Sequence, residues 1–578
     1  MYVLGINAAF HDSAAALVKD GKIIAAAEEE RFTHIKHGKR PLPFSTYELP
    51  FHAIDYCLKT AGIHLNDVDR IAYSFDPTGL EDSLASNDDL RTYSNSILGD
   101  VLAQPDINVY KGWDELFLKY IRNAPEQLRD GYPHHLQKRF RGTNDLQDKW
   151  SFINHHVAHA ASAYFPSPFN RAAVLTLDGR GEKATTGYFI GEGNVMTQLS
   201  TVDMPHSLGM LYEKMTTYLG FLNSSDEYKV MALASYGRPV YLEEFRSLIH
   251  VGEDGDYTID DFDPEKWWGI GRTREDPFDQ IHFDIAHSLQ KVLEETVLKL
   301  VNWLHTKVGS ENLCMAGGVA LNCVMNAVIR DKGPFKNVWV QPAAGDAGTA
   351  LGAALWVDVN LNAYGSEKRY TAVMDHVYHG PSYTDEEIEK FMIWAKMPYR
   401  KLDDVAKETA RILADDKIIA WYQGRMEFGP RSLGSRSILA SPIPNDMQWR
   451  LNDIKDREDF RPVAPVVLEE DAADWFVNGG VSPFMLFVYP VQEDKADKIP
   501  AVRHTDGTAR VQTINRNQHP AYYDLISEFK KLTGVPVLVN TSFNTRGEPI
   551  VCTPRDAIEC FWTSPFDALI INSFLLEK

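Results

Sequence analysis

Cysteine is scarce in this chain, which limits the class of protein it can be. Five cysteines occur in 578 residues, and no two of them have the C-x-x-C spacing. So few thiols in so long a chain exclude a framework of disulfide bonds. The length allows two to four domains with hydrophobic cores of their own, and we expect two large units.

Long apolar segments and a basic leader are also missing. No stretch approaches the roughly 18 uninterrupted apolar residues that cross a bilayer. The first residues, MYVLGINAAFHDSAAALVKDG, contain no basic segment, and Asn7, His11 and Asp12 interrupt their apolar runs. We therefore expect neither a signal peptide nor a membrane partner. Together with the few cysteines, these features predict a cytoplasmic protein.

Positive charge is in deficit. The chain contains 80 Asp and Glu against 59 Lys and Arg, which gives a formal charge of -21. Broad binding to a nucleic-acid backbone requires clustered cationic surface. A tRNA or DNA substrate is therefore disfavoured, and we expect no nucleic-acid partner.

The residues that are present indicate α/β structure. The chain begins with the apolar runs YVLGIN, AAALVK and KIIAAAEEE, and Asp20-Gly21 between the last two predicts a hairpin. Three later segments run from an apolar strand into a glycine turn that carries an acid or an amide: 172–182, 312–322 and 338–355. Glycine lets backbone N–H groups approach an anion, and open α/β sheets gather ligands at strand ends. These glycines could also simply make turns.

Two further segments suggest how the chain is divided. Residues 80–150 become polar and helical in pattern, which predicts a helical surface insertion, such as a cap on the substrate side. The run NLNAYGSEKRYTAVMDHVYHGPSYTDEEI loses its periodicity and contains Gly, Pro and Ser. We expect the boundary between two domains there.

Histidines four residues apart suggest a metal site in the segment HHVAHAASAY. If the segment is helical, His155 and His159 lie on one face and can share an ion. A metallopeptidase would need Glu directly after the first histidine, where this chain has His156, so peptide hydrolysis is disfavoured. Asp178 and Asp346 each end an apolar run in a glycine turn and would complete a set of two His and two Asp, which suits Fe(II), Zn or Mn. Packed histidines and aspartates of Asx turns are the alternative.

A cationic stretch follows in the second half of the chain. Residues 425–461 contain seven Lys or Arg, interleaved with Ser and Gly, a composition suited to phosphate or carboxylate. Simple ion pairs with surface Asp and Glu are the alternative. The candidate anion-binding residues here and in later segments are Arg431, Lys455, Arg461, Arg510, Asn540, Ser542 and Arg546.

Taken together, these motifs resemble the NodU/CmcH family of O-carbamoyltransferases. The resemblance runs over nearly the whole chain except 80–150, where acceptor specificity is expected to differ. It implies an actin-like ATPase (ASKHA) duplicated α/β domain over 1–370, followed by a YrdC-like α/β domain over 371–578. The motifs that carry it are GINAAFHDSAAAL, AEEERFTHIKHG, HHVAHAASAY, LTLDGRGE, SDEYKVMALASYG, GGVALN, GDAGTALGAAL, GRMEFGPRSLGSRSIL, KDREDFRPVAP, HTDGTARVQ and NTSFNTRGEPIV.

The resemblance also implies an activity. The second domain is expected to make carbamoyl-adenylate and pyrophosphate from carbamoyl phosphate and ATP, with Mg accompanying ATP. The first domain is expected to use a metal, usually Fe(II), to transfer the carbamoyl group to a hydroxyl of a small natural product. The chain resembles the family at the metal ligands His155, His159, Asp178 and Asp346, at the catalytic residues His11, Arg431, Lys455, Arg510 and Ser542, and at the nucleotide-side residues Gly317, Gly318, Asn322, Arg461, Asn540 and Arg546.

Other functions remain open on the sequence alone. A tRNA threonylcarbamoyl-type transferase would share much of this architecture, but the acidic composition argues against it. A metallohydrolase or sugar kinase would use the first domain and leave the cationic stretch unexplained. A nucleotide-binding regulator would bind ATP without turnover. Neither the acceptor nor the oligomeric state can be derived from the sequence.

Overall fold

The structure is a computed structural model of the 578-residue chain. It describes residues 1–38, 49–79, 118, 120–130, 139–140, 143–545 and 547–578. The predicted insertion at 80–150 lies mostly outside these residues, and the part that is described includes helix α6 (Ala124–Asp130).

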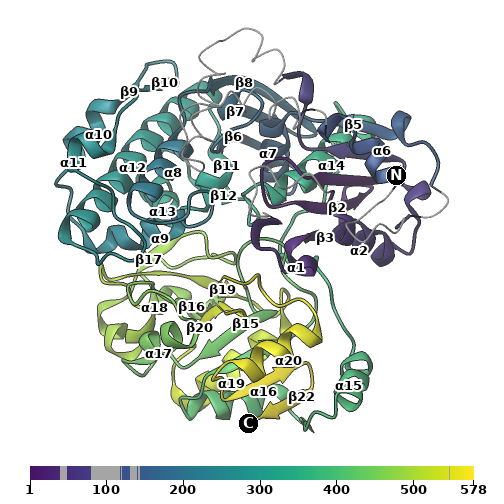
Figure 1. Ribbon diagram of the computed structural model, residues 1–578, viewed down its shortest axis with the longest axis vertical. Coiled ribbons are helices and arrows are strands. Elements are labelled where there is room, and N and C mark those ends of the chain that lie inside the picture. Colours follow the sequence, from purple (N-terminus) through teal and green to yellow (C-terminus); the bar gives the residue numbers. More distant parts are fainter. Residues whose placement is uncertain (39–48, 80–117, 119, 131–138, 141–142, 546) are drawn as a thin grey trace.

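Two five-stranded sheets with the same topology form the first part of the chain (Figure 1). The first has the order β3-β2-β1-β4-β5 and the second β8-β7-β6-β11-β12. In each, the first three strands are antiparallel and the last two run parallel to the central strand. This repetition is the duplicated α/β arrangement that the resemblance implies. The strands are β1 (Tyr2–Asn7), β2 (Ala14–Lys19), β3 (Lys22–Glu28), β4 (Arg70–Tyr73), β5 (Trp150–Phe152), β6 (Arg171–Leu177), β7 (Ala184–Glu192), β8 (Val195–Asp203), β11 (Asn312–Ala316) and β12 (Asn337–Val340).

Two closely packed helices, α7 (His155–Tyr164) and α14 (Ala347–Asn362), join these sheets. The Asn154 side chain accepts a hydrogen bond from a backbone N–H in the first turn of α7 and so begins that helix. A Cβ atom added at Gly352 would lie 1.8 Å from the carbonyl oxygen of Ala158, so glycine permits the close approach of the two helices. This contact sets the distance between α7 and the start of α14.

The other helices of the first part cover the outer faces of the sheets (Figure 1). The longest is α12, whose apolar side joins the largest hydrophobic core. A two-stranded ribbon of β9 (Ile249–Val251) and β10 (Tyr257–Ile259) lies at the periphery. The helices are α1 (Glu30–Thr33), α2 (Phe51–Ala61), α8 (Leu208–Tyr218), α9 (Glu227–Leu233), α10 (Leu242–Leu248), α11 (Pro264–Trp268), α12 (Gln280–Val308) and α13 (Cys323–Lys332).

A third sheet of eight strands organises the remainder of the chain, with the order β13-β22-β21-β14-β15-β20-β16-β19. Most of its buried apolar residues form a second core, although the core of the first part also includes Phe428, Leu433 and Ala464. Strand β17 pairs with β18 at the border of this sheet. The strands are β13 (Arg400–Lys401), β14 (Ile419–Tyr422), β15 (Arg436–Ala440), β16 (Ala464–Leu468), β17 (Val488–Pro490), β18 (Thr508–Arg510), β19 (Gln512–Ile514), β20 (Val537–Ser542), β21 (Ala568–Ile571) and β22 (Phe574–Glu577). The helices are α15 (Asp385–Trp394), α16 (Val405–Ala414), α17 (Met447–Ile454), α18 (Ala472–Trp475), α19 (Pro520–Thr533) and α20 (Pro554–Thr563).

Several sequence predictions can be compared with this architecture. The hairpin at Asp20-Gly21 is present, with both residues at positive φ between β2 and β3. No helix or strand occurs between α14 and α15, around the expected domain boundary. The division at residue 370 and the YrdC-like type of the second domain stay predictions. Within the described residues, no helix is long and apolar enough to traverse a bilayer.

Candidate metal centre and anion site

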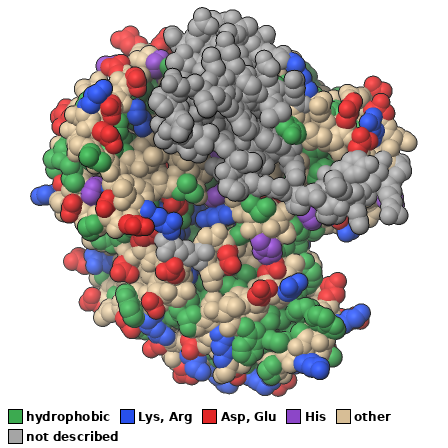
Figure 2. Space-filling model, in the orientation of Figure 1, with side chains coloured by type: hydrophobic (Ala, Val, Ile, Leu, Met, Phe, Trp, Pro, Cys, Tyr) green, Lys and Arg blue, Asp and Glu red, His purple; other side chains and the backbone are tan. Residues whose placement is uncertain are grey.

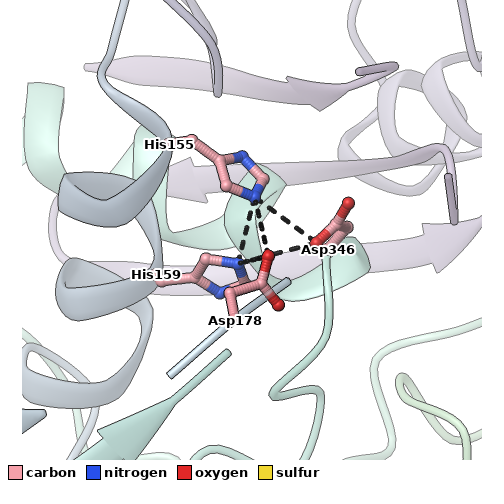
Figure 3. Close-up of side chains that lie close together, drawn as sticks. All are labelled: His155, His159, Asp178 and Asp346. Carbon is pink, nitrogen blue, oxygen red and sulfur yellow. Dashed lines mark hydrogen bonds and ion pairs between the residues drawn. The ribbon is translucent and has the colours of Figure 1, made fainter. Parts of the chain in front are cut away.

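Four buried side chains from three separate elements converge at the start of α7 and α14 (Figure 3). His155 and His159 lie on α7, Asp178 follows β6, and Asp346 directly precedes α14. His155 Nε2 lies 3.4 Å from Asp346 Oδ1 and 3.7 Å from Asp178 Oδ2. His159 Nε2 lies 3.6 Å and 3.9 Å from the same two atoms. The set of two His and two Asp is therefore assembled in space.

The donor atoms of this group fit a divalent metal ion. Atoms that share one ion with bonds of about 2.1 Å lie about 3 to 3.5 Å apart, close to the spacing observed here. His155 Nδ1 lies 3.1 Å from the carbonyl oxygen of Ser74, which fixes Nε2 as the nitrogen that faces the carboxylates. In the described part of the chain, Asp346 Oδ1 is buried without a hydrogen-bond partner. Imidazole and carboxylate ligands together suit Fe(II), Zn or Mn.

The charges within the group depend on one another. Burial disfavours the charged form of His155, but the carboxylates of Asp346 and Asp178 outweigh it and raise the pKa of this imidazole well above its usual value. Burial also disfavours charge on Asp178 and Asp346, yet nearby histidines lower the pKa of both carboxyl groups. Two buried carboxylates therefore require positive charge beside them, which protons or a metal ion can supply.

Glu182, which supports this group, was not predicted from the sequence. The buried carboxylate of Glu182 accepts hydrogen bonds from the N–H of His155 at 2.9 Å and from the Asn154 side chain at 2.9 Å, and burial raises its pKa to about 7. Only the position of Glu182 in the LDGRGE turn could have drawn attention to it. The third histidine of the motif, His156, faces away from the group and lies 2.7 Å from the Thr176 hydroxyl.

Two of the predicted nucleotide-side residues of the first part, Gly317 and Gly318, lie beside this group. The Gly318 N–H donates to Asp178 Oδ1 over 2.7 Å and holds that carboxylate in place. Gly317 has a φ of 93°, and a Cβ atom there would lie 2.1 Å from the Leu177 carbonyl oxygen. The Asn322 side chain caps α13. Their role in binding a nucleotide stays a prediction.

His11 borders the metal-ligand group from a tight turn after β1. Its Nε2 atom lies 3.8 Å from Asp346 Oδ2, and its Nδ1 atom lies 2.9 Å from Asp12 Oδ2. The buried Asn7 side chain donates to the carbonyl oxygens of His11 and Asp12 and holds the turn. His37 Nδ1 lies 2.8 Å from the other oxygen of Asp12. His11 is thus oriented toward the group and remains partly exposed.

A second group, here called the anion site, gathers cations in the second part of the chain: Arg431, Lys455, Arg457, Arg461 and Arg510. Burial and the charge of Arg510 lower the pKa of Arg431 to about 9, and burial with the charge of Arg461 lowers that of Arg457 to about 9. Among the residues that the structure describes, Arg431 Nε, Arg457 Nη2 and Arg510 Nε are buried without an acceptor. The cations repel one another and suit an anionic ligand.

Lys455 lies among neutral oxygen atoms. Its Nζ atom donates to Ser542 Oγ at 3.2 Å and to Asn544 Oδ1 at 2.7 Å. Burial and the charges of Arg457 and Arg461 lower the pKa of Lys455 well below its usual value. Lys455 and Ser542 were predicted separately, and the structure brings them into contact. Arg457 was missed although it stands in the quoted KDREDFRPVAP motif.

The remaining cationic-stretch residues have varied surroundings. Arg461 lies 4.9 Å from the Tyr228 ring and 3.5 Å from Glu458. Asn540 donates to Gln512 at 2.7 Å and so braces the strand beside the anion site. Arg546 lies outside the described residues. On the face shown in Figure 2, Lys and Arg side chains lie at the junction between the two parts of the chain.

The fold and these two groups define a two-site α/β protein, with metal-type ligands in a duplicated first part and an anion site in the second. A family model described as Carbamoyltransferase N-terminus matches residues 2–355, and one described as Carbamoyltransferase C-terminus matches residues 410–578. The chain therefore belongs to the carbamoyltransferase family, an enzyme family, as the sequence motifs predicted.

Individual relatives agree with this membership. An uncharacterised protein of Synechocystis, sll1178, is 41% identical over 623 residues, which cover 100% of this chain and 97% of that protein. Nodulation protein NolNO of Sinorhizobium fredii is 40% identical, over 99% of this chain and 80% of its own. Component A of (R)-2-hydroxyglutaryl-CoA dehydratase from Acidaminococcus fermentans covers 62% of this chain and 99% of its own, with a TM-score of 0.32 and 16% identity. This last similarity is too low to establish a fold.

Proposed function

We propose that this chain is an O-carbamoyltransferase with two separate reaction sites. The anion site forms carbamoyl-adenylate from carbamoyl phosphate and ATP, and the carbamoyl group is then transferred to a hydroxyl of a small natural product beside the group of His155, His159, Asp178 and Asp346. The observation that carries the proposal is the cluster of cations in the anion site, where Arg431 Nε, Arg457 Nη2 and Arg510 Nε have no acceptor among the described residues. None of these cations belongs to the group of metal-type ligands.

The first step uses two phosphate-bearing substrates. Carbamoyl phosphate loses its phosphoryl group to water as inorganic phosphate, and the carbamate oxygen attacks the α-phosphorus of ATP, so that pyrophosphate leaves. Arg431, Lys455, Arg461 and Arg510 offset the charge that converges there, as cations do in phosphoryl chemistry. The hydroxyl of Ser542 accepts from Lys455 and donates to Asn544 Oδ1 at 2.7 Å, and it turns that proton to a phosphate oxygen when the substrate binds. Mg accompanies ATP.

The second step releases AMP. The acceptor hydroxyl attacks the carbamoyl carbon, the bond to the phosphate oxygen breaks, and the proton of the hydroxyl moves to His11, whose usual pKa near 6.5 suits a base at neutral pH. Fe(II) or another divalent ion, held by His155, His159, Asp178 and Asp346, would supply positive charge to a carbonyl or phosphate oxygen. Asp12 holds His11 in the orientation that faces Asp346.

A small molecule is a better acceptor than tRNA for this chain. The formal charge of -21 opposes association with a nucleic-acid backbone. Lys455 of the anion site is buried and its four arginines are only partly exposed, so they form no broad basic surface. Binding of tRNA with a steep salt dependence would contradict this part of the proposal.

Phosphorus NMR tests the proposed reaction directly. The intact protein, with a divalent metal and Mg, is incubated with ATP and carbamoyl phosphate. The proposal predicts AMP, pyrophosphate and phosphate, with no reaction when inorganic phosphate replaces carbamoyl phosphate. Formation of ADP instead would indicate a kinase, and the absence of any turnover despite ATP binding would indicate a regulatory protein.

A further inference from the structure

We propose that Glu30 and Arg31 are positioning residues that couple occupancy of the anion site to the placement of His11. The inference rests on the proposed function, because it assigns a regulatory link between its two sites. A continuous series of contacts runs from Gly429, two residues before Arg431, to Asp346 of the metal-type group.

The first contacts of the series join the two parts of the chain. The Arg31 guanidinium donates to the Gly429 carbonyl oxygen at 3.0 Å and to Glu28 at 3.2 Å, and the Gly429 N–H donates to the same Glu28 oxygen at 2.8 Å. The side chains of Glu28 and Arg31 are buried. Gly429 has a φ of 122°, and a Cβ atom there would lie 3.1 Å from the Pro342 carbonyl oxygen. The loop that carries Arg431 is therefore clamped on the first part.

The next contacts lead from this clamp to the turn of His11. A second nitrogen of Arg31 lies 2.8 Å from Glu30, and the other oxygen of Glu30 accepts a hydrogen bond from the His37 N–H. The His37 ring contacts Asp12, and Asp12 contacts His11, at 2.8 Å and 2.9 Å. Each residue in the series contacts the next through a polar atom.

Helix α1, which carries Glu30 and Arg31, is well placed to transmit a movement. Its Phe32 packs against Met426 and Ile550 of the second part. The same short helix therefore touches the loop of the anion site through both polar and apolar contacts, while its next polar contact is to His37 of the first part.

The turn of His11 is held in a strained backbone conformation by its side-chain contacts. Phe10 and Asp12 have φ values of 47° and 52°, a left-handed conformation that is strained for residues other than glycine. The contacts of Asn7 and His37 hold this conformation. A weakened His37 contact would let the turn relax and move His11 away from Asp346. A turn that relaxes in this way would provide the two arrangements that coupling between two sites requires.

The coupling has a chemical purpose. Carbamoyl-adenylate hydrolyses in water, so a link between the placement of the base and the occupancy of the anion site limits that loss. When phosphate groups draw Arg431 toward them, the shift of Gly429 reaches His11 through Arg31, Glu30 and His37.

Thermodynamic linkage provides the test, with Co(II) as the metal probe. We would measure the Co(II) affinity of the intact protein from its absorption spectrum, with and without the α,β-methylene analogue of ATP, Mg and carbamoyl phosphate. The intact protein is expected to show about a fivefold or larger change in affinity, and Co(II) should change the affinity for the analogue by the same factor. Arg510→Ala, which weakens the anion site, should show no change.

Variants at two points of the series separate positioning from folding. In Glu30→Gln and in His37→Gln, the ligands of the anion site should change the Co(II) affinity by less than about twofold. The affinity of these variants for the ATP analogue without Co(II) should equal that of the intact protein. The matched control is Glu29→Gln, since Glu29 is equally buried but contacts His52 and Ala53 instead. That variant should retain the full change.

The outcomes distinguish this inference from the proposed function. If calorimetry detects no binding of the analogue or carbamoyl phosphate, the proposed function fails and the coupling fails with it. If both ligands bind but the Co(II) affinity of the intact protein does not change, the coupling is wrong and the proposed function stands. A full change in Co(II) affinity in both Glu30→Gln and His37→Gln would also overturn the role of Glu30 and Arg31 in the coupling.

Discussion

The Nε2 atoms of His155 and His159 lie 3.2 Å apart, one helical turn from each other on α7. Asp346 Oδ1 lies 3.4 Å from the first and 3.6 Å from the second. Two imidazoles that face each other so closely cannot both carry a proton without strong repulsion. A shared metal ion resolves this conflict and gives Asp346 a partner.

Removal of one imidazole should therefore abolish tight metal binding. We expect His159→Ala to lose more Co(II) affinity than the roughly 10- to 100-fold that loss of a supporting contact costs. In the intact protein, Co(II) at about 100 times its Kd should stabilise the fold by about 2.7 kcal/mol, which thermal unfolding detects. His156→Gln is the control, because His156 contacts Thr176 and not the group. Equal Co(II) stabilisation of His159→Ala would contradict the assignment.

The anion site should respond to simple anions without any reaction. Pyrophosphate is expected to raise the unfolding temperature of the intact protein, because it offsets the mutual repulsion of the clustered cations. Arg510→Gln removes one of these charges, so its unfolding temperature without ligand should stay the same or rise, and pyrophosphate should stabilise it far less.

An exposed arginine provides the control for that measurement. Arg503 lies in the same segment of the chain but is exposed. Arg503→Gln should leave stabilisation by pyrophosphate unchanged, and an equal loss in both variants would point to nonspecific screening of charge.

Lys455 predicts a specific dependence of stability on pH. Its pKa is lowered in the folded protein, by burial and then by Arg457 and Arg461, so the unfolded chain binds the extra proton between this lowered pKa and the usual value near 10.5. Stability should therefore increase with pH across that window and be lost as the pH falls through it. Urea unfolding at several pH values measures the slope. Lys455→Met should flatten the slope of stability against pH. An unchanged slope in this variant would show that other groups cause the dependence.

The contact between α7 and α14 should be intolerant of added volume. An extra methyl group at Gly352 meets the Ala158 backbone, so Gly352→Ala should destabilise the fold by about 1 to 3 kcal/mol. It should also weaken Co(II) binding, because α14 begins next to Asp346. Gly480→Ala, where the added Cβ has no neighbour within 4 Å, should be nearly neutral. Equal stability of both variants, by urea unfolding, would contradict this packing argument.

Local sequence patterns account for much of the fold. Alternation of apolar runs with Asp20-Gly21 predicted the first hairpin, because a hairpin depends on neighbouring residues. The repetition of the two five-stranded sheets was invisible as a sequence repeat, since the same strand order can be built from unrelated apolar residues. It entered only through the resemblance to a family.

The candidate site was predictable to a similar extent. His155 and His159 could be recognised from their residue type and their spacing. Glu182, which supports their helix, lies 27 residues after His155 in the chain and could not be recognised in this way. The clamp of Arg31 on Gly429 spans 398 residues. Such contacts depend on tertiary packing, and no local pattern encodes them.

The release of pyrophosphate from ATP and carbamoyl phosphate, without any acceptor, tests the division of labour most directly. The intact protein and His155→Ala are predicted to release pyrophosphate at similar rates, because adenylation occurs in the anion site. Ser542→Ala is predicted to release pyrophosphate about tenfold or more slowly, because the hydroxyl that it lacks contacts Lys455 in that site. Release that is lost in His155→Ala but kept in Ser542→Ala would contradict the account.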